Sequence, residues 1–136
     1  MPKKQSTIAL ITDFGLQDGY VGVMKGVIST INPSASVIDI SNTIAAQDIF
    51  QAACVLNNSY NYFPKGTIHV VVVDPGVGSD RKILCLKTED YTFLAPDNGV
   101  LSLVIEKEES SSIIEVTNDK FFLPKLSNTF HGRDIF

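Results

Sequence analysis

The spacing of apolar residues changes repeatedly along the first half of the chain and predicts alternating strands and helices. Residues 7–12 form a short apolar, partly β-branched run that is typical of a buried strand. From residue 20 to residue 31, apolar side chains recur three and four positions apart, as on one helix face. Residues 37–40 repeat the strand pattern and residues 47–60 the helical pattern. Residues 67–73 include four consecutive valines, which favour a central strand covered on both faces.

The second half of the chain predicts shorter elements. Residues 83–86 and 91–94 have the pattern of two strands, and the polar residues between them predict a hairpin. A short helix is expected over residues 100–105, and a last strand over residues 113–116. The charged and serine-rich stretch 106–112 is expected to be a solvated loop.

This order of elements predicts an α/β fold with a mainly parallel sheet flanked by helices. Strands that alternate with helices form right-handed βαβ units, which build parallel sheets. Ligands of such sheets bind beyond the carboxyl ends of the strands. The residues that follow the predicted strands are therefore the candidates for function.

Composition narrows the class of protein. A chain of 136 residues, 44% of them hydrophobic, suits one domain with a real core. The net charge of −4 excludes the basic surface of a nucleic-acid-binding protein. No apolar run approaches the ~20 residues of a membrane span, and the N-terminus lacks the pattern of a secretory signal. Cys54 and Cys85 have neither disulfide nor zinc spacing, so we expect buried thiols in a cytoplasmic protein.

Acidic side chains accompany four of the predicted strands. Asp13 follows the first strand, Asp74 the third and Asp97 the fifth, while Asp39 lies within the second. Carboxylates at one rim of a sheet can bind a metal ion, hold a ribose diol or cap helices. Capping is the simplest interpretation for Asp18 and Asp48, which precede the predicted helices, but it fits Asp74 poorly because a glycine-containing loop follows it. That loop lacks the residues of a nucleotide phosphate motif.

Few basic and imidazole groups are available for chemistry. His131 stands between Phe130 and Gly132, a setting that favours a functional role. His69 falls inside a predicted strand, and we expect it to be structural. Arg81 is one of only two arginines, and it could fold back onto Asp74.

Six short motifs, in order along the chain, closely resemble those of the S-adenosyl-L-methionine (SAM) hydroxide adenosyltransferases. This family is related to the SAM-dependent fluorinase and chlorinase, and the resemblance runs from about residue 8 to residue 136. The motifs are TDFG at 12–15, YVGVMKG at 20–26, YFPKGT at 62–67, VDPGVGS at 73–79, APDNG at 95–99 and TFHGRD at 129–134.

The resemblance implies an enzyme that converts SAM and water into adenosine and L-methionine. SAM is then a substrate, and neither a cofactor nor a metal ion is implied. The family's site residues map onto a catalytic set of Asp74, Arg81 and His131, a ribose-binding Asp13, and further substrate-binding positions at Phe14, Asp97, Asn98 and Gly132. The connection from Asp74 to Asp97 is short and all three catalytic residues are present, which resembles the hydroxide type rather than the halogenating relatives.

The resemblance also implies a larger molecule. The family joins an N-terminal α/β domain to a C-terminal β-barrel domain, and it forms homotrimers that hold SAM between domains of neighbouring subunits. We therefore expect residues 1–136 to be the N-terminal catalytic domain of a longer chain. Alone, it is expected to bind SAM weakly and to turn over negligibly.

Three alternatives remain open at this stage. The first is a metal-dependent hydrolase built on the acidic strand ends and His131, although no His-x-Asp or His-x-x-x-His pair supports it. The second is a non-catalytic SAM- or adenosine-binding module. The third is a purely structural α/β domain.

Overall fold

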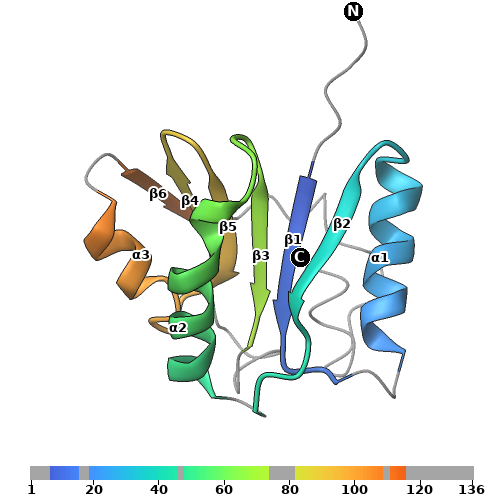
Figure 1. Cartoon of the computed structure of the whole chain (residues 1–136), viewed down its shortest axis with the longest axis horizontal. Helices are drawn as coiled ribbons and strands as arrows, with labels where there is room; N and C mark the ends of the chain where they lie inside the picture. Colours follow the sequence, from blue (N-terminus) through green and yellow to red (C-terminus); the bar gives the residue numbers. More distant parts are fainter. Residues whose placement is uncertain (1–6, 16–18, 46–47, 74–81, 109–110, 116–136) are drawn as a thin grey trace, which may run out of the picture.

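A six-stranded sheet with the strand order β2-β1-β3-β5-β4-β6 organises the chain (Figure 1). The computed structural model describes residues 7–15, 19–45, 48–73, 82–108 and 111–115. The strands are β1 (Thr7–Thr12), β2 (Ser36–Ser41), β3 (Ile68–Val72), β4 (Ile83–Thr88), β5 (Thr92–Pro96) and β6 (Ser111–Glu115). The helices are α1 (Tyr20–Ile31), α2 (Ile49–Ser59), the short 3-10 helix η1 (Tyr60–Tyr62) and α3 (Ser102–Lys107).

The sheet is mainly parallel, as the alternating pattern predicts. β1 pairs with β2 and β3, and β3 pairs with β5, all in parallel. β4 runs antiparallel to both β5 and β6. The predicted hairpin is confirmed, since β4 and β5 are joined by a turn in which the Thr88 amide donates to the Tyr91 carbonyl at 2.9 Å.

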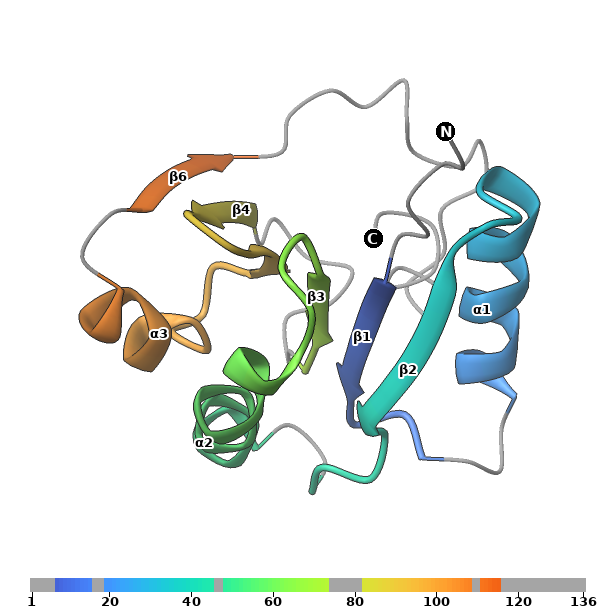
Figure 2. The same ribbon diagram turned by 45° about the horizontal axis from the view of Figure 1, so that its top comes forward.

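Helices cover both faces of the sheet (Figure 2). Because side chains of a strand alternate between faces, the valines of β3 divide between two apolar cores. Val70 and Val72 belong to the core beneath α1, with Leu10 and Met24. Val71 belongs to the core beneath α2 and α3. The valine run therefore forms the covered central strand that its composition predicts.

Helix α2 begins where its capping residue predicts. The Asp48 carboxylate accepts a hydrogen bond from the Gln51 amide at 3.0 Å, which satisfies one of the free amides of the first turn. The capping interpretation is thus confirmed for Asp48, whereas Asp18 lies outside the described residues.

The prediction of a loop over residues 106–112 was wrong at both ends. Helix α3 continues through Lys107, and β6 begins at Ser111. Ser111 and Ser112 pair with Thr88 and Lys87 of β4. Serine is tolerated there because the side chains of β6 face solvent, so their polarity gives no sign of the strand.

Candidate active site

The carboxyl ends of β1, β3 and β5 meet along one edge of the sheet, and the predicted site residues follow them. β2 lies on one side of β1, and β3 lies on the other side. The direction in which successive strands are added to the sheet therefore reverses between β1 and β3. Open α/β sheets bind ligands at such a reversal, beyond the carboxyl ends of the strands. Asp13 follows β1 at this point, and it is partly exposed.

The turn after β1 has a defined geometry. The Phe14 amide donates to the Thr12 hydroxyl at 3.3 Å, and the Gly15 amide donates to the Asn42 carbonyl at 2.8 Å. Gly15 has a φ of 73°, a conformation that other residues rarely adopt. Phe14 packs against the apolar core beneath α1, so its ring anchors the turn to the sheet. Asp13 is therefore held between anchored neighbours.

The segment after β5 is tied to β3. The Asn98 side-chain amide donates to the Val73 carbonyl at 2.9 Å, and its oxygen accepts from the Val100 amide at 3.1 Å. The Asp97 amide donates to the Lys82 carbonyl at 2.8 Å, and the Asp97 side chain is exposed. These bonds give Asn98 a structural task that its motif does not reveal. They bring the Asp97–Asn98 segment beside the end of β3.

The structure does not describe the remaining predicted site residues. Asp74, Arg81, His131 and Gly132 lie outside the described residues. Asp39 is not grouped with Asp13 as the acidic strand ends suggest. Its carboxylate lies 2.7 Å from the ammonium group of Lys25 on α1, because it sits inside β2 rather than beyond its end.

Sequence reasoning missed a buried polar pair at the same edge. The Thr12 hydroxyl donates to the Asn42 side-chain oxygen at 3.0 Å. Both residues are almost fully buried. Thr12 opens the first motif, but nothing in the sequence singles out Asn42.

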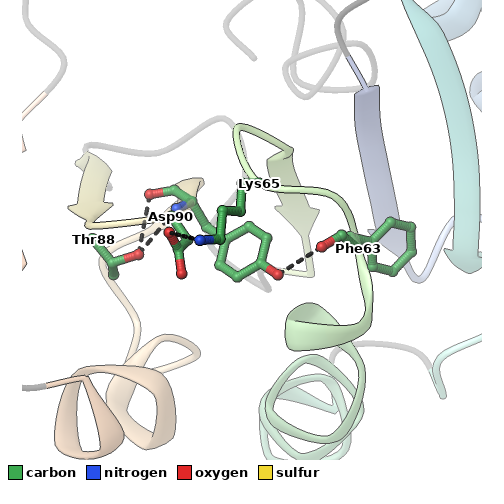
Figure 3. A network of polar contacts seen from close by, with 5 residues as sticks. Phe63, Lys65, Thr88 and Asp90 are labelled. Carbon is green, nitrogen blue, oxygen red and sulfur yellow. Dashed lines mark hydrogen bonds and ion pairs between the residues drawn. The ribbon is translucent and has the colours of Figure 1, made fainter.

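Aromatic side chains pack together at the amino end of β3, away from the candidate site. Tyr60, Phe63, Tyr91 and Phe93 surround His69 with ring centroids 5.1–6.2 Å from its own, and we call these five residues the aromatic cluster. The Tyr91 hydroxyl donates to the Phe63 carbonyl at 2.6 Å, beside the Lys65–Asp90 ion pair (Figure 3). The Tyr60 hydroxyl donates to Glu108 at 2.6 Å. The cluster lies at the amino end of β3, away from Asp13.

His69 is structural, as its strand position predicts. It is 1% exposed, and neither ring nitrogen has a hydrogen-bond partner among the described residues. Burial lowers the pKa of His69 from 6.5 to about 4, and the nearby Tyr60 carbonyl opposes this only in part. The imidazole is therefore neutral at pH 7.

Acidification should destabilise the protein through this group. The unfolded chain binds a proton at His69 below about pH 6.5, whereas the folded chain resists it until about pH 4. Stability should therefore fall as the pH drops through this window, by up to roughly 3 kcal/mol from His69. Urea unfolding at pH 7, 6, 5 and 4.5 measures the loss, and His69→Leu should flatten the curve. Parallel pH profiles for parent and variant would rule out this role.

The described residues form neither a membrane-spanning helix nor a cluster of metal-binding side chains. In the ranges that the structure describes, no helix is long and apolar enough to cross a membrane. Among these same residues, no three His, Cys, Asp or Glu side chains are placed to hold a metal ion. Cys54 and Cys85 are free thiols, and Cys85 is buried as predicted, whereas Cys54 is only partly buried.

Polar side chains at the reversal point of an open, mainly parallel sheet define an α/β domain of the kind that binds small molecules. The family model described as the SAM hydroxide adenosyltransferase N-terminal domain matches residues 8–136. The chain therefore belongs to the SAM hydroxide adenosyltransferase family.

Individual relatives agree with this assignment. The chain is 43% identical over 134 residues to the (R)-S-adenosyl-L-methionine hydrolase of Methanocaldococcus jannaschii. This alignment covers 95% of the chain and 49% of the relative. It is 24% identical over 151 residues to a fluorinase of an Actinoplanes species, covering 94% and 51%. The crystal structure of an uncharacterized conserved protein from Thermotoga maritima superimposes with a TM-score of 0.90 at 46% identity, covering 95% and 50%. The chain thus spans about half the length of these relatives.

Proposed function

We propose that the full-length protein hydrolyses SAM to adenosine and L-methionine. The observation that carries this proposal is the position of Asp13, partly exposed at the reversal point of a chain that matches the family model over residues 8–136. A carboxylate at that position can accept hydrogen bonds from both hydroxyls of a ribose. The relative from M. jannaschii is named for hydrolysis of the (R) form of SAM, which supports the (R) sulfonium epimer as the substrate.

Water rather than a halide ion is the proposed nucleophile. The alignment with the Actinoplanes fluorinase needs 151 positions, whereas that with the M. jannaschii hydrolase needs 134 for nearly the same share of this chain. This chain therefore lacks residues that the fluorinase contains within the matched region. Asp74, Arg81 and His131 are all present, as in the hydroxide type.

The proposed chemistry is an in-line displacement at C5′ of SAM. The oxygen of water forms a bond to C5′ while the C5′–sulfur bond breaks. The electron pair of the broken bond stays on sulfur, so the positive charge of the sulfonium is lost and methionine leaves as a neutral thioether. No acid is needed for this leaving group, so the enzyme must instead activate water, whose pKa is near 15.7 in bulk. Arg81 stabilises the developing hydroxide and His131 accepts the released proton, while Asp74 holds Arg81 in place. Asp13 fixes the ribose and hence C5′.

The same proposal includes the setting of the reaction. The enzyme acts without a cofactor, since its substrate carries its own leaving group. We propose a homotrimer, with the remainder of the substrate site supplied by parts of the protein beyond this chain. We also propose a cytoplasmic location, which fits the free thiols of Cys54 and Cys85.

Isotope-labelled water tests the reaction directly. Full-length protein incubated with the separated sulfonium epimers should release adenosine and L-methionine in equal amounts, faster from the (R) epimer. In ¹⁸O-labelled water the label should enter the 5′-hydroxyl of adenosine, because water attacks C5′. Absence of adenosine from correctly assembled protein would exclude the hydrolase, and calorimetry with SAM would then reveal a binding module.

A further inference from the structure

A buried pair of polar side chains, Thr12 and Asn42, contacts the turn that contains Asp13. Thr12 is 0% exposed and Asn42 is 4% exposed. The Thr12 hydroxyl donates to the Asn42 side-chain oxygen at 3.0 Å and accepts from the Phe14 amide at 3.3 Å. The Asn42 carbonyl accepts from the Gly15 amide at 2.8 Å. Asn42 is thereby joined to both sides of Asp13.

An irregularity in strand pairing produces this contact. Leu10 pairs with Asp39, but Ile11 pairs with Ser41, so one residue of β2 is passed over. Continuing the shifted register sets Asn42 opposite Thr12. Regular pairing would have set Ser41 there, and Asn42 would have pointed to the other face. Bulges of this kind frequently re-aim a side chain next to an active site.

The main effect of the Thr12–Asn42 pair is to restrict the turn after β1, and its effect on the stability of the core is small. A buried hydroxyl and amide stabilise the fold little more than apolar groups of the same shape. They differ from apolar groups because hydrogen bonds are directional, so each bond restricts the conformation of the turn that contains Asp13. A carboxylate must be oriented well if its two oxygens are to meet two ribose hydroxyls.

We propose that Asn42 and Thr12 are positioning residues that set the orientation of the Asp13 carboxylate toward the substrate ribose. This inference rests on the proposed function, in which Asp13 holds that ribose. Asn42, the residue after β2, acts through the Thr12 hydroxyl and through the Gly15 amide, and it does not touch the substrate itself.

Selectivity for the ribose 2′-hydroxyl tests this role in the full-length protein. Thr12→Val removes the hydroxyl but keeps the shape, and should lower kcat/KM for SAM roughly tenfold. The preference for SAM over its 2′-deoxy analogue should shrink by about the same factor. Thr12→Ser keeps the hydroxyl, so its kcat/KM and its selectivity should stay near the parent values. Asn42→Ala removes the side-chain amide that accepts from Thr12 but keeps the backbone carbonyl that accepts from Gly15, and it provides a second variant if Thr12→Val does not fold.

A double-mutant cycle makes the test sharper. In an Asp13→Asn background, Thr12→Val should change the selectivity little further, because both substitutions act on one contact. A purely structural role would instead lower kcat/KM equally for SAM and the 2′-deoxy analogue. Unchanged selectivity in both Thr12→Val and Asn42→Ala would overturn the proposal.

Binding separates this inference from the proposed reaction. Calorimetry with adenosine and 2′-deoxyadenosine measures the same preference without turnover. If the parent protein binds adenosine but hydrolyses no SAM, the proposed function fails and the positioning role is still decided by the binding ratio. If the parent shows no preference for adenosine, the positioning role fails as well.

Discussion

Replacement of Arg81 by alanine in the full-length protein is expected to lower kcat for SAM hydrolysis by roughly 10²- to 10³-fold. In the proposed mechanism the guanidinium stabilises negative charge that develops on the attacking water, so its loss should act on the transition state more than on substrate binding. KM should therefore change little. Chromatographic measurement of adenosine release at several SAM concentrations separates the two constants.

The neighbouring lysine offers a matched control for Arg81. Lys82 is also cationic, but its ammonium group is largely exposed and lies 3.5 Å from Glu115 on β6. Lys82→Ala should leave kcat within about twofold, because surface ion pairs contribute little. Equal losses for Arg81→Ala and Lys82→Ala would indicate a general effect of charge rather than a catalytic guanidinium. His131→Ala should resemble Arg81→Ala, since both groups activate the same water.

Phe93→Ala is expected to destabilise the protein by about 3–5 kcal/mol. Phe93 is fully buried near the start of β5, and its ring stacks on His69 with a centroid distance of 5.1 Å. It also makes an edge contact with Tyr60 at 5.4 Å. Truncation leaves a cavity in the aromatic cluster that rigid neighbours cannot fill. The midpoint of urea unfolding measures the loss.

Phe50 provides the comparison for Phe93. It lies in the first turn of α2 and is 76% exposed. Phe50→Ala should change stability by no more than about 0.5 kcal/mol. A loss for Phe50→Ala similar to that for Phe93→Ala would mean that the exposed ring is covered in the assembled protein.

Much of the fold is predictable because the spacing of apolar residues within each segment matches the helix or strand that the segment forms. The spacing of apolar residues gives α1 its bounds at Tyr20 and Ile31, and the valine run gives β3 its central place. The order of strands beyond β3 has no local signal. β5 rather than β4 pairs with β3, although β4 comes first in the chain. That choice depends on the hairpin folding back, which is a tertiary effect.

The site is predictable in part for a similar reason. A residue after a parallel strand must lie at the carboxyl edge, so Asp13 and Asp97 could be placed from the sequence. Asp39 lies within β2, as the sequence pattern predicts, so the same reasoning does not place it at that edge. Asn42 could not be found at all, since its role depends on a one-residue shift in pairing that no composition or spacing encodes.

The long-range pairing of β3 has a consequence for how the protein folds. Ile8 pairs with Ile68, and Val70 with Leu94, so the sheet joins segments that are synthesised far apart in time. Such contacts form slowly, because the intervening loops must close before any pairing energy is gained. The edge that carries Asp13 and Asn98 is complete only once β3 and β5 have docked beside β1 and β2. A ligand that binds at this edge would therefore stabilise the finished sheet without guiding the early steps of its assembly.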